Sequence, residues 1–431
     1  MAIDMGILQA LAANVLSWVF STFLPAFMPK LLPAIEAEDT STRASAESET
    51  NQTKCIAIGR PGGSEQLRLI ALQPGIATCG YNIKGFKCPF TKPLKDDTPP
   101  DCVVLQNEAF SVNYADCCIR WGLYESANQF VGWPIVPGFD VAGTVEKVGS
   151  SSSFQVGDKV FGCTLFGAYS TRVLVPSLQL KKIPEGLSIP QAASLPAVSL
   201  TALYALFLAG HYGSHYKLTN RAILIHSASG GVGSMLVQMS KILGLNPIVG
   251  VVGRTQKVEE AKRLGCHVVI DKSQEDLWLK AEEASPQGYS AVMDANGVST
   301  LEESYNHLAA SGRLIVYGFH SNLPIGRAAL SPMEWISMAQ KASSMPKFDP
   351  MDLTKSNKSI LSFNLSFFAD ETDVLSQFFD QICEWIQQGK LAPPRVVEYP
   401  MDQIVEAHEL IQSGKSIGKI VLTTPAEPDT I

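Results

Sequence analysis

The chain has 431 residues, enough for about two or three domains, and this length excludes a small protein held together only by disulfides. Its 34 basic and 41 acidic residues give a net charge of −7, so no global positive field is present to hold nucleic acid. Hydrophobic residues make up 46% of the chain and charged residues 17%, a composition that excludes collagen-like and disordered classes.

Residues 1–35 form a hydrophobic N-terminal segment. From Gly6 to Leu24 no charged residue occurs, and most side chains are bulky and apolar. We expect residues 6–24 to be a membrane anchor, a targeting sequence or a helix lying in a membrane interface. A secretory signal fits poorly, because Asp4 precedes the stretch and the first cation is Lys30. The alternative is a helix packed on the body of the protein or on a partner.

Residues 36–53 are rich in Ser, Thr, Glu and Ala, which predicts a disordered linker. Short runs with alternating or continuous apolar residues follow, separated by Gly and Pro, and they predict a small β domain over 54–190. Residues 75–99 show no clear period and are interpreted as a surface insertion. The expected strands are Cys55–Ile58, Leu67–Leu72, Cys102–Gln106, Val141–Val148, Lys159–Gly162 and Tyr169–Val175.

Residues 191–369 alternate apolar strands with helical stretches, which predicts a parallel sheet covered by helices on both faces. Residues 370–424 then complete the β domain, with a helix over Met401–Gln412 and a strand over Gly418–Thr423. The expected strands of the parallel sheet are Arg221–Ser227, Pro247–Gly253, Val268–Asp271, Ala291–Asp294 and Arg313–Gly318, with helices over Gly233–Leu243, Gln256–Leu264 and Leu301–Leu308.

The strand over 221–227 runs into Ala228-Ser-Gly-Gly-Val-Gly233 and a helix, the fingerprint of a dinucleotide site. Gly230 allows the backbone to approach a pyrophosphate, and Gly233 allows the helix to pack on the strand. The helix N-terminus offers unpaired N–H groups to anionic oxygens. We therefore expect Gly230, Gly231, Val232 and Gly233 to hold the pyrophosphate of a dinucleotide.

The adenosine ribose should be recognised at the end of the second strand. There the chain reads Gly253-Arg254-Thr255-Gln256-Lys257, with two cations and no carboxylate. Arg254, Thr255 and Lys257 suit a ribose 2′-phosphate, so NADP(H) is the expected cofactor. The alternative is that Arg254 and Lys257 only form a solvated helix start.

Further motifs follow one another in a fixed order along the chain: Asn113-Tyr-Ala-Asp116, Arg120-Trp-Gly-Leu-Tyr124, Pro137-Gly-Phe-Asp-Val-Ala-Gly143, Val148-Gly149, Val156-Gly-Asp-Lys-Val160, Gly167-Ala-Tyr169 and Ser416-Ile-Gly-Lys-Ile420. Together with the 228–233 loop they resemble the medium-chain dehydrogenase/reductase superfamily, and within it the zinc-free quinone oxidoreductase, or zeta-crystallin-like, branch. Three more segments are Met345-Pro-Lys-Phe-Asp-Pro-Met351, Asn357-Lys-Ser-Ile360 and Phe363-Asn-Leu365, and they make the chain most similar to the vesicle amine-transport-protein-like subgroup.

The resemblance implies an α/β fold with a GroES-like β-barrel-type catalytic domain and a Rossmann doubly wound domain, here with an N-terminal hydrophobic extension. Zinc-dependent members carry Gly-His-Glu where this chain has Gly138-Phe139-Asp140, so no metal site is expected. The implied reaction is hydride transfer from NADPH to a quinone or an α,β-unsaturated carbonyl. The alternative is a membrane-associated NADP-binding accessory or transport-type protein with little turnover.

By the same resemblance, Asn113 and Tyr124 lie at the nicotinamide end, and Tyr124 is a candidate proton donor or an aromatic lid over the substrate. Lys272 and Asn296 add cofactor contacts. The resemblance also implies a homodimer and a small-molecule substrate. We expect Asp116 and Arg120 to form a structural pair. The nine cysteines lack any Cys-x-x-Cys spacing, which favours reduced thiols and a cytoplasmic location, or a membrane-associated or organelle-targeted one through the N-terminal segment.

Overall fold

The computed structural model describes residues 52–72, 75–80, 91–93, 98–214, 220–322 and 332–425. The hydrophobic segment 1–35 and nearly all of the expected linker lie outside these ranges. In the described ranges, no helix is both long and apolar enough to cross a membrane. The prediction of an anchor over residues 6–24 therefore stays a prediction.

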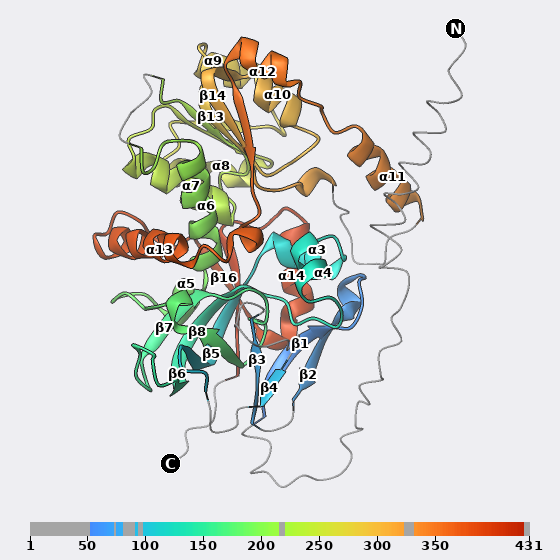
Figure 1. Ribbon diagram of the computed structural model, residues 1–431. Helices are drawn as coiled ribbons and strands as arrows, with labels where there is room; N and C mark the ends of the chain where they lie inside the picture. Colours follow the sequence, from blue (N-terminus) through green and yellow to red (C-terminus); the bar gives the residue numbers. More distant parts are fainter. Residues whose placement is uncertain are drawn as a thin grey trace.

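A six-stranded parallel sheet forms the upper half of the molecule in Figure 1. Its strand order is β12-β11-β10-β13-β14-β15, and every neighbouring pair is parallel. This is the doubly wound order, in which ligands bind at the carboxyl edge where the order reverses, between β10 and β13. The strands are β10 (Ile223–Ile225), β11 (Ile248–Val252), β12 (Val268–Asp271), β13 (Tyr289–Asp294), β14 (Leu308–Val316) and β15 (Ser359–Ser362).

Both faces of this sheet are covered, as predicted. Ile223 and Ile225 pack into one hydrophobic cluster, whereas Leu224 between them packs into another on the opposite face. All three are completely buried, because side chains alternate along a strand and helices lie on both sides. The helices of this half are α6 (Pro196–Leu208), α7 (Gly231–Ile242), α8 (Val258–Leu264), α9 (Leu277–Ala284), α10 (Leu301–Asn306), α11 (Pro332–Ser343), α12 (Pro350–Ser356) and α13 (Thr372–Gln387). Of these, α11 extends away from the sheet in Figure 1.

The lower half in Figure 1 is the GroES-like domain, built mainly from antiparallel strands. The long strand β5 (Cys102–Val112) lies at its centre and pairs with β6, β8 and β17. The other elements are β1 (Lys54–Ile58), β2 (Leu67–Ala71), β3 (Ile76–Cys79), β4 (Thr91–Pro93), β6 (Asp140–Val148), β7 (Lys159–Cys163), β8 (Arg172–Pro176), β9 (Leu180–Lys182), β16 (Val396–Pro400), β17 (Lys419–Thr423), α3 (Tyr114–Arg120), α4 (Glu125–Phe130), α5 (Ile189–Ala193) and α14 (Ile404–Gln412).

The interpretation of residues 75–99 as a surface insertion is wrong for β3. Ala77 and Thr78 are completely buried, and β3 pairs with β8 and β4 inside the large sheet. The Thr78 hydroxyl donates to the carbonyl oxygens of Gly167 at 2.9 Å and Arg172 at 3.0 Å. A polar residue can lie in this core because its hydroxyl is fully used, and that is why the strand lacks an apolar signature.

The C-terminal strand β17 joins the two halves of the molecule. It runs antiparallel to β5 and parallel to β16. Just before it, the Gly418 N–H donates to the Ser229 carbonyl oxygen in the glycine-rich loop at 2.9 Å. Residues 418–423 therefore contact both the central strand of one domain and the glycine-rich loop of the other.

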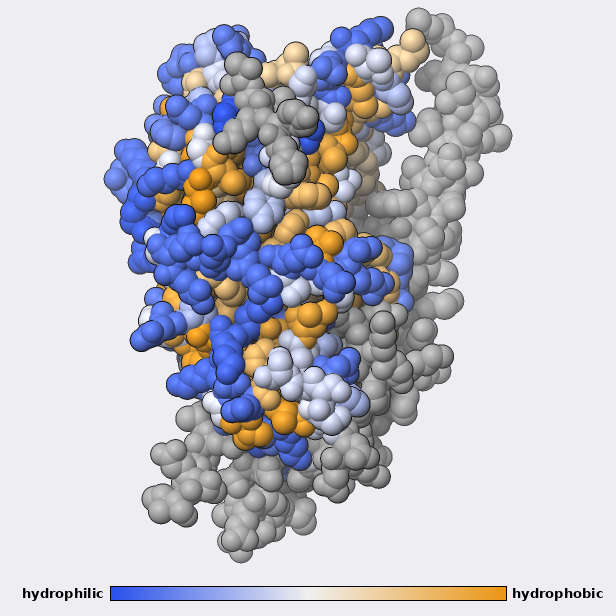
Figure 2. Space-filling view, turned by 60° about the vertical axis from the view of Figure 1, so that its left-hand side comes forward, coloured by the Kyte–Doolittle hydropathy of each residue, from blue (hydrophilic) through white to orange (hydrophobic). Residues whose placement is uncertain are grey.

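Much of the apolar content of the described chain lies inside these two domains. On α13, for example, Phe379, Ile382 and Trp385 face the core and are at most 7% exposed. On the face shown in Figure 2, hydrophobic residues form separate patches bordered by hydrophilic ones. The high hydrophobic fraction is thus explained in large part by the buried sheets, apart from residues 6–24.

Candidate active site

The glycine-rich loop follows β10, and α7 begins at Gly231. A Cβ on Gly233 would lie 2.2 Å from the Ser227 carbonyl oxygen, so only glycine lets the helix pack this closely. A Cβ on Gly230 would meet only that same oxygen, at 3.2 Å. No side chain caps α7, which leaves its N-terminal N–H groups to an anion. The two glycines thus have the different surroundings that pyrophosphate binding requires.

Three cations gather beyond the ends of β11 and β12, next to that loop. The Lys272 side chain lies against Gly253, with its Cε 3.5 Å from where a Cβ on Gly253 would be. Burial and the neighbouring Arg254 lower the pKa of Lys257 to about 8. Like charges this close destabilise each other unless an anion lies between them. The residues therefore fit a ribose 2′-phosphate.

Thr255 differs from its predicted role as a phosphate ligand. Its hydroxyl donates to Asp271 Oδ2 at 2.6 Å, and Asp271 lies at the end of β12. Asn296 follows β13 and is 7% exposed, with its N–H donating to Asp294 Oδ1 at 2.8 Å. The structure thus brings all the predicted cofactor residues to one edge of the parallel sheet. The Thr255 hydroxyl, however, is directed to Asp271, and the Arg254 guanidinium donates to the Ser413 carbonyl oxygen at 3.3 Å.

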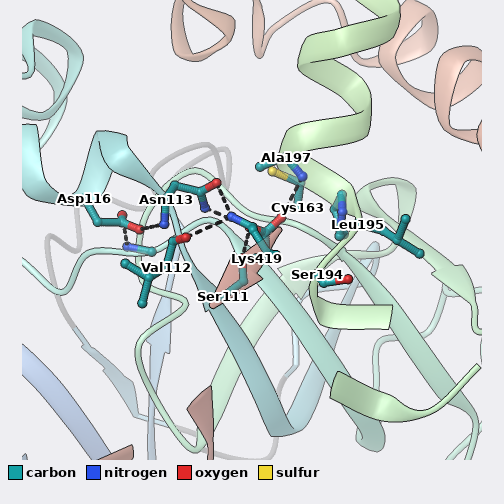
Figure 3. Close-up of polar contacts among 12 residues, drawn as sticks. Ser111, Val112, Asn113, Asp116, Cys163, Ser194, Leu195, Ala197 and Lys419 are labelled. Carbon is teal, nitrogen blue, oxygen red and sulfur yellow. Dashed lines mark hydrogen bonds and ion pairs between the residues drawn. The ribbon is translucent and has the colours of Figure 1, made fainter. Parts of the chain in front are cut away.

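Asn113 lies directly after β5, at the N-cap of α3, and its side chain enters a buried polar cluster (Figure 3). Its amide Nδ2 donates to Asp140 Oδ2 at 2.8 Å, and its Oδ1 accepts from the Lys419 ammonium. Asp140 also accepts from the Ser111 hydroxyl and from the Ala197 N–H at the start of α6. The cluster therefore joins the GroES-like domain to the first helix of the nucleotide domain.

The sequence analysis missed Lys419. It is 3% exposed, and its Nζ lies 3.6 Å from Asp140 Oδ2. The available signal was a single lysine at the start of an apolar strand, within Ser416-Ile-Gly-Lys-Ile420. A lysine is buried only when it is paired, so its place in an apolar strand predicts a buried partner such as a carboxylate.

Asp116 lies beside this cluster and is completely buried. Its carboxylate accepts from the N–H groups of Asn113 at 2.8 Å and Gly138 at 3.1 Å, and from the Tyr169 hydroxyl at 3.0 Å. Burial raises the pKa of Asp116 to about 7, against the lowering effect of the Asn113 N–H and of Lys419. The predicted pair of Asp116 with Arg120 is wrong, because Arg120 instead donates to Gln412 Oε1 at 2.6 Å.

Tyr124 packs against Phe139 and Phe166, with ring centroids 6.1 and 6.5 Å away. Its hydroxyl donates to Asn364 Oδ1 at 2.9 Å and lies 3.1 Å from Ser366 Oγ. Burial raises the pKa of Tyr124, so the phenol stays protonated at neutral pH. The structure thus places Tyr124 in an aromatic wall, and its roles as proton donor or lid stay predictions.

Asp116 is expected to make the protein less stable as pH rises from about 4 to 7. An unfolded chain releases this proton near pH 4, whereas the folded protein holds it to about 7. The folded state therefore binds more protons in this window, and stability contributed by Asp116 falls as pH increases. The free energy of unfolding of wild type minus that of Asp116→Asn, both measured by denaturant unfolding, should decrease as pH rises over this range. A constant difference would contradict the raised pKa.

Tyr169→Phe is the matched variant, because it removes a hydrogen bond that lowers the same pKa. In this variant the folded protein should hold the Asp116 proton to a higher pH than wild type does. The decrease in stability should therefore continue to a higher pH.

In the residues that the structure describes, no three His, Cys, Asp or Glu side chains come together in a way that could hold a metal ion. The Asp140 oxygens, at the position of the Gly-His-Glu motif, are taken by the contacts described above.

Comparison with known proteins agrees with this architecture. Residues 99–185 match the family described as alcohol dehydrogenase GroES-like domain, and residues 264–422 match the one described as zinc-binding dehydrogenase. The chain belongs to the medium-chain dehydrogenase/reductase superfamily. Within it, the chain groups with the quinone oxidoreductases and the VAT-1-like proteins, as the motifs predicted.

Among curated proteins, the zebrafish (Danio rerio) synaptic vesicle membrane protein VAT-1 homolog is 30% identical over 323 residues, which is 75% of this chain. The match spans 64% of the zebrafish protein's length. A 2-haloacrylate reductase from a Burkholderia species is 34% identical over 52% of this chain and 67% of its own length. The rat (Rattus norvegicus) quinone oxidoreductase is 29% identical over 74% of this chain and 88% of its own length.

Solved structures show the same fold. The quinone oxidoreductase of Pseudomonas syringae superposes with a TM-score of 0.66 at 27% identity, over 86% of this chain and 99% of that one. A mycobacterial protein solved with NADPH superposes with a TM-score of 0.67 at 25% identity, over 86% and 99% of the two chains.

Proposed function

We propose that this protein is an NADPH-dependent, zinc-independent oxidoreductase that reduces a quinone or an α,β-unsaturated carbonyl. One observation carries the proposal: Arg254 and Lys257 follow β11, and the end of β11 has no acidic residue. Strand β11 pairs with β10, and its Val251 carbonyl oxygen accepts from the Ala228 N–H of the glycine-rich loop at 3.0 Å. This arrangement suits the 2′-phosphate that distinguishes NADPH from NADH.

The protein's own residues hold and orient the reactants. The N-terminus of α7 binds the pyrophosphate, and Arg254, Lys257 and Lys272 bind the 2′-phosphate. NADPH supplies the hydride when it is bound. Asn113 lies at the nicotinamide end, and the aromatic wall around Tyr124 excludes water and contacts the substrate. A carbon–carbon double bond conjugated to a carbonyl accepts hydride without a Lewis acid. This fits Gly138-Phe139-Asp140, which stands where zinc-dependent members carry Gly-His-Glu.

The substrate class draws on the named activities of two relatives. One is a quinone oxidoreductase and the other a 2-haloacrylate reductase, and both kinds of acceptor carry a conjugated carbonyl. The test is NADPH oxidation, followed by absorbance, against a panel of quinones and α,β-unsaturated carbonyls. Turnover with one of the two groups names the substrate class. Tight NADPH binding without turnover on any acceptor would refute the enzymatic function.

Tyr124→Phe separates the two roles of this residue. If the hydroxyl delivers a proton, kcat should fall about 100-fold or more, within the usual range for general acid catalysis. If the ring acts as a lid, kcat should change less than about 3-fold, because phenylalanine keeps the packing with Phe139 and Phe166. Steady-state kinetics on the best acceptor decides, and NADPH affinity, measured by fluorescence, serves as the folding control.

A second candidate function rests on residues 6–24 and on the VAT-1 relatives, which are named as synaptic vesicle membrane proteins. In this case the protein binds NADP(H) but serves as a membrane-associated accessory protein. Cell fractionation with and without residues 1–36 tests the association. Equal recovery of both forms in the soluble fraction would rule it out.

We also propose a homodimer, and sedimentation of the purified protein tests it.

A further inference from the structure

Lys419 is a buried cation with several oxygen partners. Its Nζ donates to the Val112 carbonyl oxygen at 3.0 Å and to Asn113 Oδ1, and it lies 3.6 Å from Asp140 Oδ2. Figure 3 shows the ammonium between the end of β5 and the start of α6. A buried lysine is costly to desolvate, and here Asp140 and the hydrogen bonds offset the cost. Lys419 is thus fixed in one position.

The partners of Asn113 fix which way its amide points. Its Oδ1 faces the Lys419 ammonium, and its Nδ2 faces the Asp140 carboxylate at 2.8 Å. Rotating the amide by half a turn would place a donor against the ammonium and an acceptor against the carboxylate. Both contacts would be repulsive, so only one orientation is stable. One hydrogen of Nδ2 is donated to Asp140. Because Asp140 and Lys419 fix the plane of the amide, they also fix the direction of the second hydrogen.

Lys419 also lies against the phosphate loop. Gly418 bonds to Ser229, as described above, and the Lys419 Cδ lies 3.4 Å from where a Cβ on Gly231 would be. Gly231 is the first residue of α7, whose N-terminus is the proposed pyrophosphate site. A single side chain therefore contacts the start of that helix along its stem and Asn113 at its tip.

We propose that Lys419 is a positioning residue for hydride transfer, which fixes the Asn113 amide toward the nicotinamide end of the site without touching the substrate. The inference rests on the proposed function. Small displacements of a group that orients a reactant lower kcat strongly, while binding through other groups is kept.

Lys419→Met and Lys419→Gln are the test pair. Methionine and glutamine have side chains of the same length, but only glutamine carries a hydrogen-bond donor. We expect Lys419→Met to lower kcat about 10- to 100-fold, with KM for NADPH changed less than about 3-fold. Lys419→Gln should recover most of the lost kcat. Equal kcat in both variants and wild type, per folded protein, would show a merely structural role. A Gln variant as slow as the Met variant would point to direct chemistry by Lys419. Either result overturns the proposal.

A second readout does not depend on turnover. In protein labelled with ¹⁵N-asparagine, the side-chain amide signal of Asn113 is assigned by its loss in Asn113→Ser. It should shift or broaden in Lys419→Met and stay near the wild-type position in Lys419→Gln. An unchanged signal in Lys419→Met overturns the inference. If wild type reduces no acceptor, the proposed function fails, but this measurement still decides whether Lys419 holds the amide.

Lys419→Met leaves Asp140 as an unpaired buried charge and could fail to fold. The double variant Lys419→Met with Asp140→Asn removes both charges and serves as its replacement. The Asn113 signal should again differ from wild type, and a wild-type signal would overturn the inference.

Discussion

Replacing Gly233 by alanine should abolish NADPH binding and lower the stability of the nucleotide domain by about 1–3 kcal/mol or more. The new Cβ would lie 2.2 Å from the Ser227 carbonyl oxygen and 2.9 Å from the Ala228 Cα. Both are backbone atoms between β10 and α7, so neither can rotate away as a side chain can. The helix must move off the strand, and the pyrophosphate site moves with it. Thermal unfolding and NADPH fluorescence titration measure the two effects.

Gly230→Ala is the matched control for this substitution. Gly230 has φ −82°, which alanine adopts without strain, and its Cβ would approach only the Ser227 oxygen, at 3.2 Å. We expect near wild-type stability but weakened NADPH binding, because the methyl group would occupy the space that the pyrophosphate approaches. A Gly233→Ala protein that melts and binds NADPH like wild type would contradict the packing argument.

Replacing Arg254 and Lys257 together by alanine should weaken NADPH binding about 100-fold or more and leave NADH binding within about 3-fold. Each charged hydrogen bond to a phosphate contributes about 1.5–3 kcal/mol, and about 1.4 kcal/mol corresponds to a factor of ten in affinity. NADH lacks the 2′-phosphate and loses only a weak long-range attraction. Titration of both cofactors against the double variant and wild type measures the two ratios.

Lys262→Ala is the control, since Lys262 is an exposed cation of the following helix that pairs with Glu259 at 2.9 Å. It should leave both affinities unchanged. Thr255→Val should also have a small effect on NADPH, because the hydroxyl is directed to Asp271. Equal losses of NADPH and NADH affinity in the double variant would refute the assignment of the 2′-phosphate site.

The parts of the site that the sequence predicted are those formed by neighbouring residues. The glycine-rich loop and the Gly253–Lys257 segment each follow an apolar strand directly, so the parallel sheet brings them to one edge. Strand β3 was missed because Thr78 interrupts its apolar character and is satisfied by distant carbonyl groups. Tyr124 was placed near the substrate by resemblance, but its partners Asn364 and Ser366 are far away in the sequence.

The buried cluster shows why long-range contacts escape such analysis. Asp116 and Arg120 are four residues apart on α3, a spacing that favours an ion pair. Asp116 instead accepts from Asn113, Gly138 and Tyr169, and Arg120 reaches Gln412. Likewise Lys419 and Asn113 are separated by 306 positions. No local pattern identifies such partners, and only the return of the C-terminal strand to β5 brings them together.

That return also determines when the site can exist during synthesis. Strand β5 and the glycine-rich loop precede β17 in the chain and are therefore synthesised before it. Until β17 is made, the edge of β5 at Phe110 and Val112 stays open and Asp140 has no lysine partner. A protein truncated before Gly418 would keep this open edge, which is prone to pair with strands of other chains.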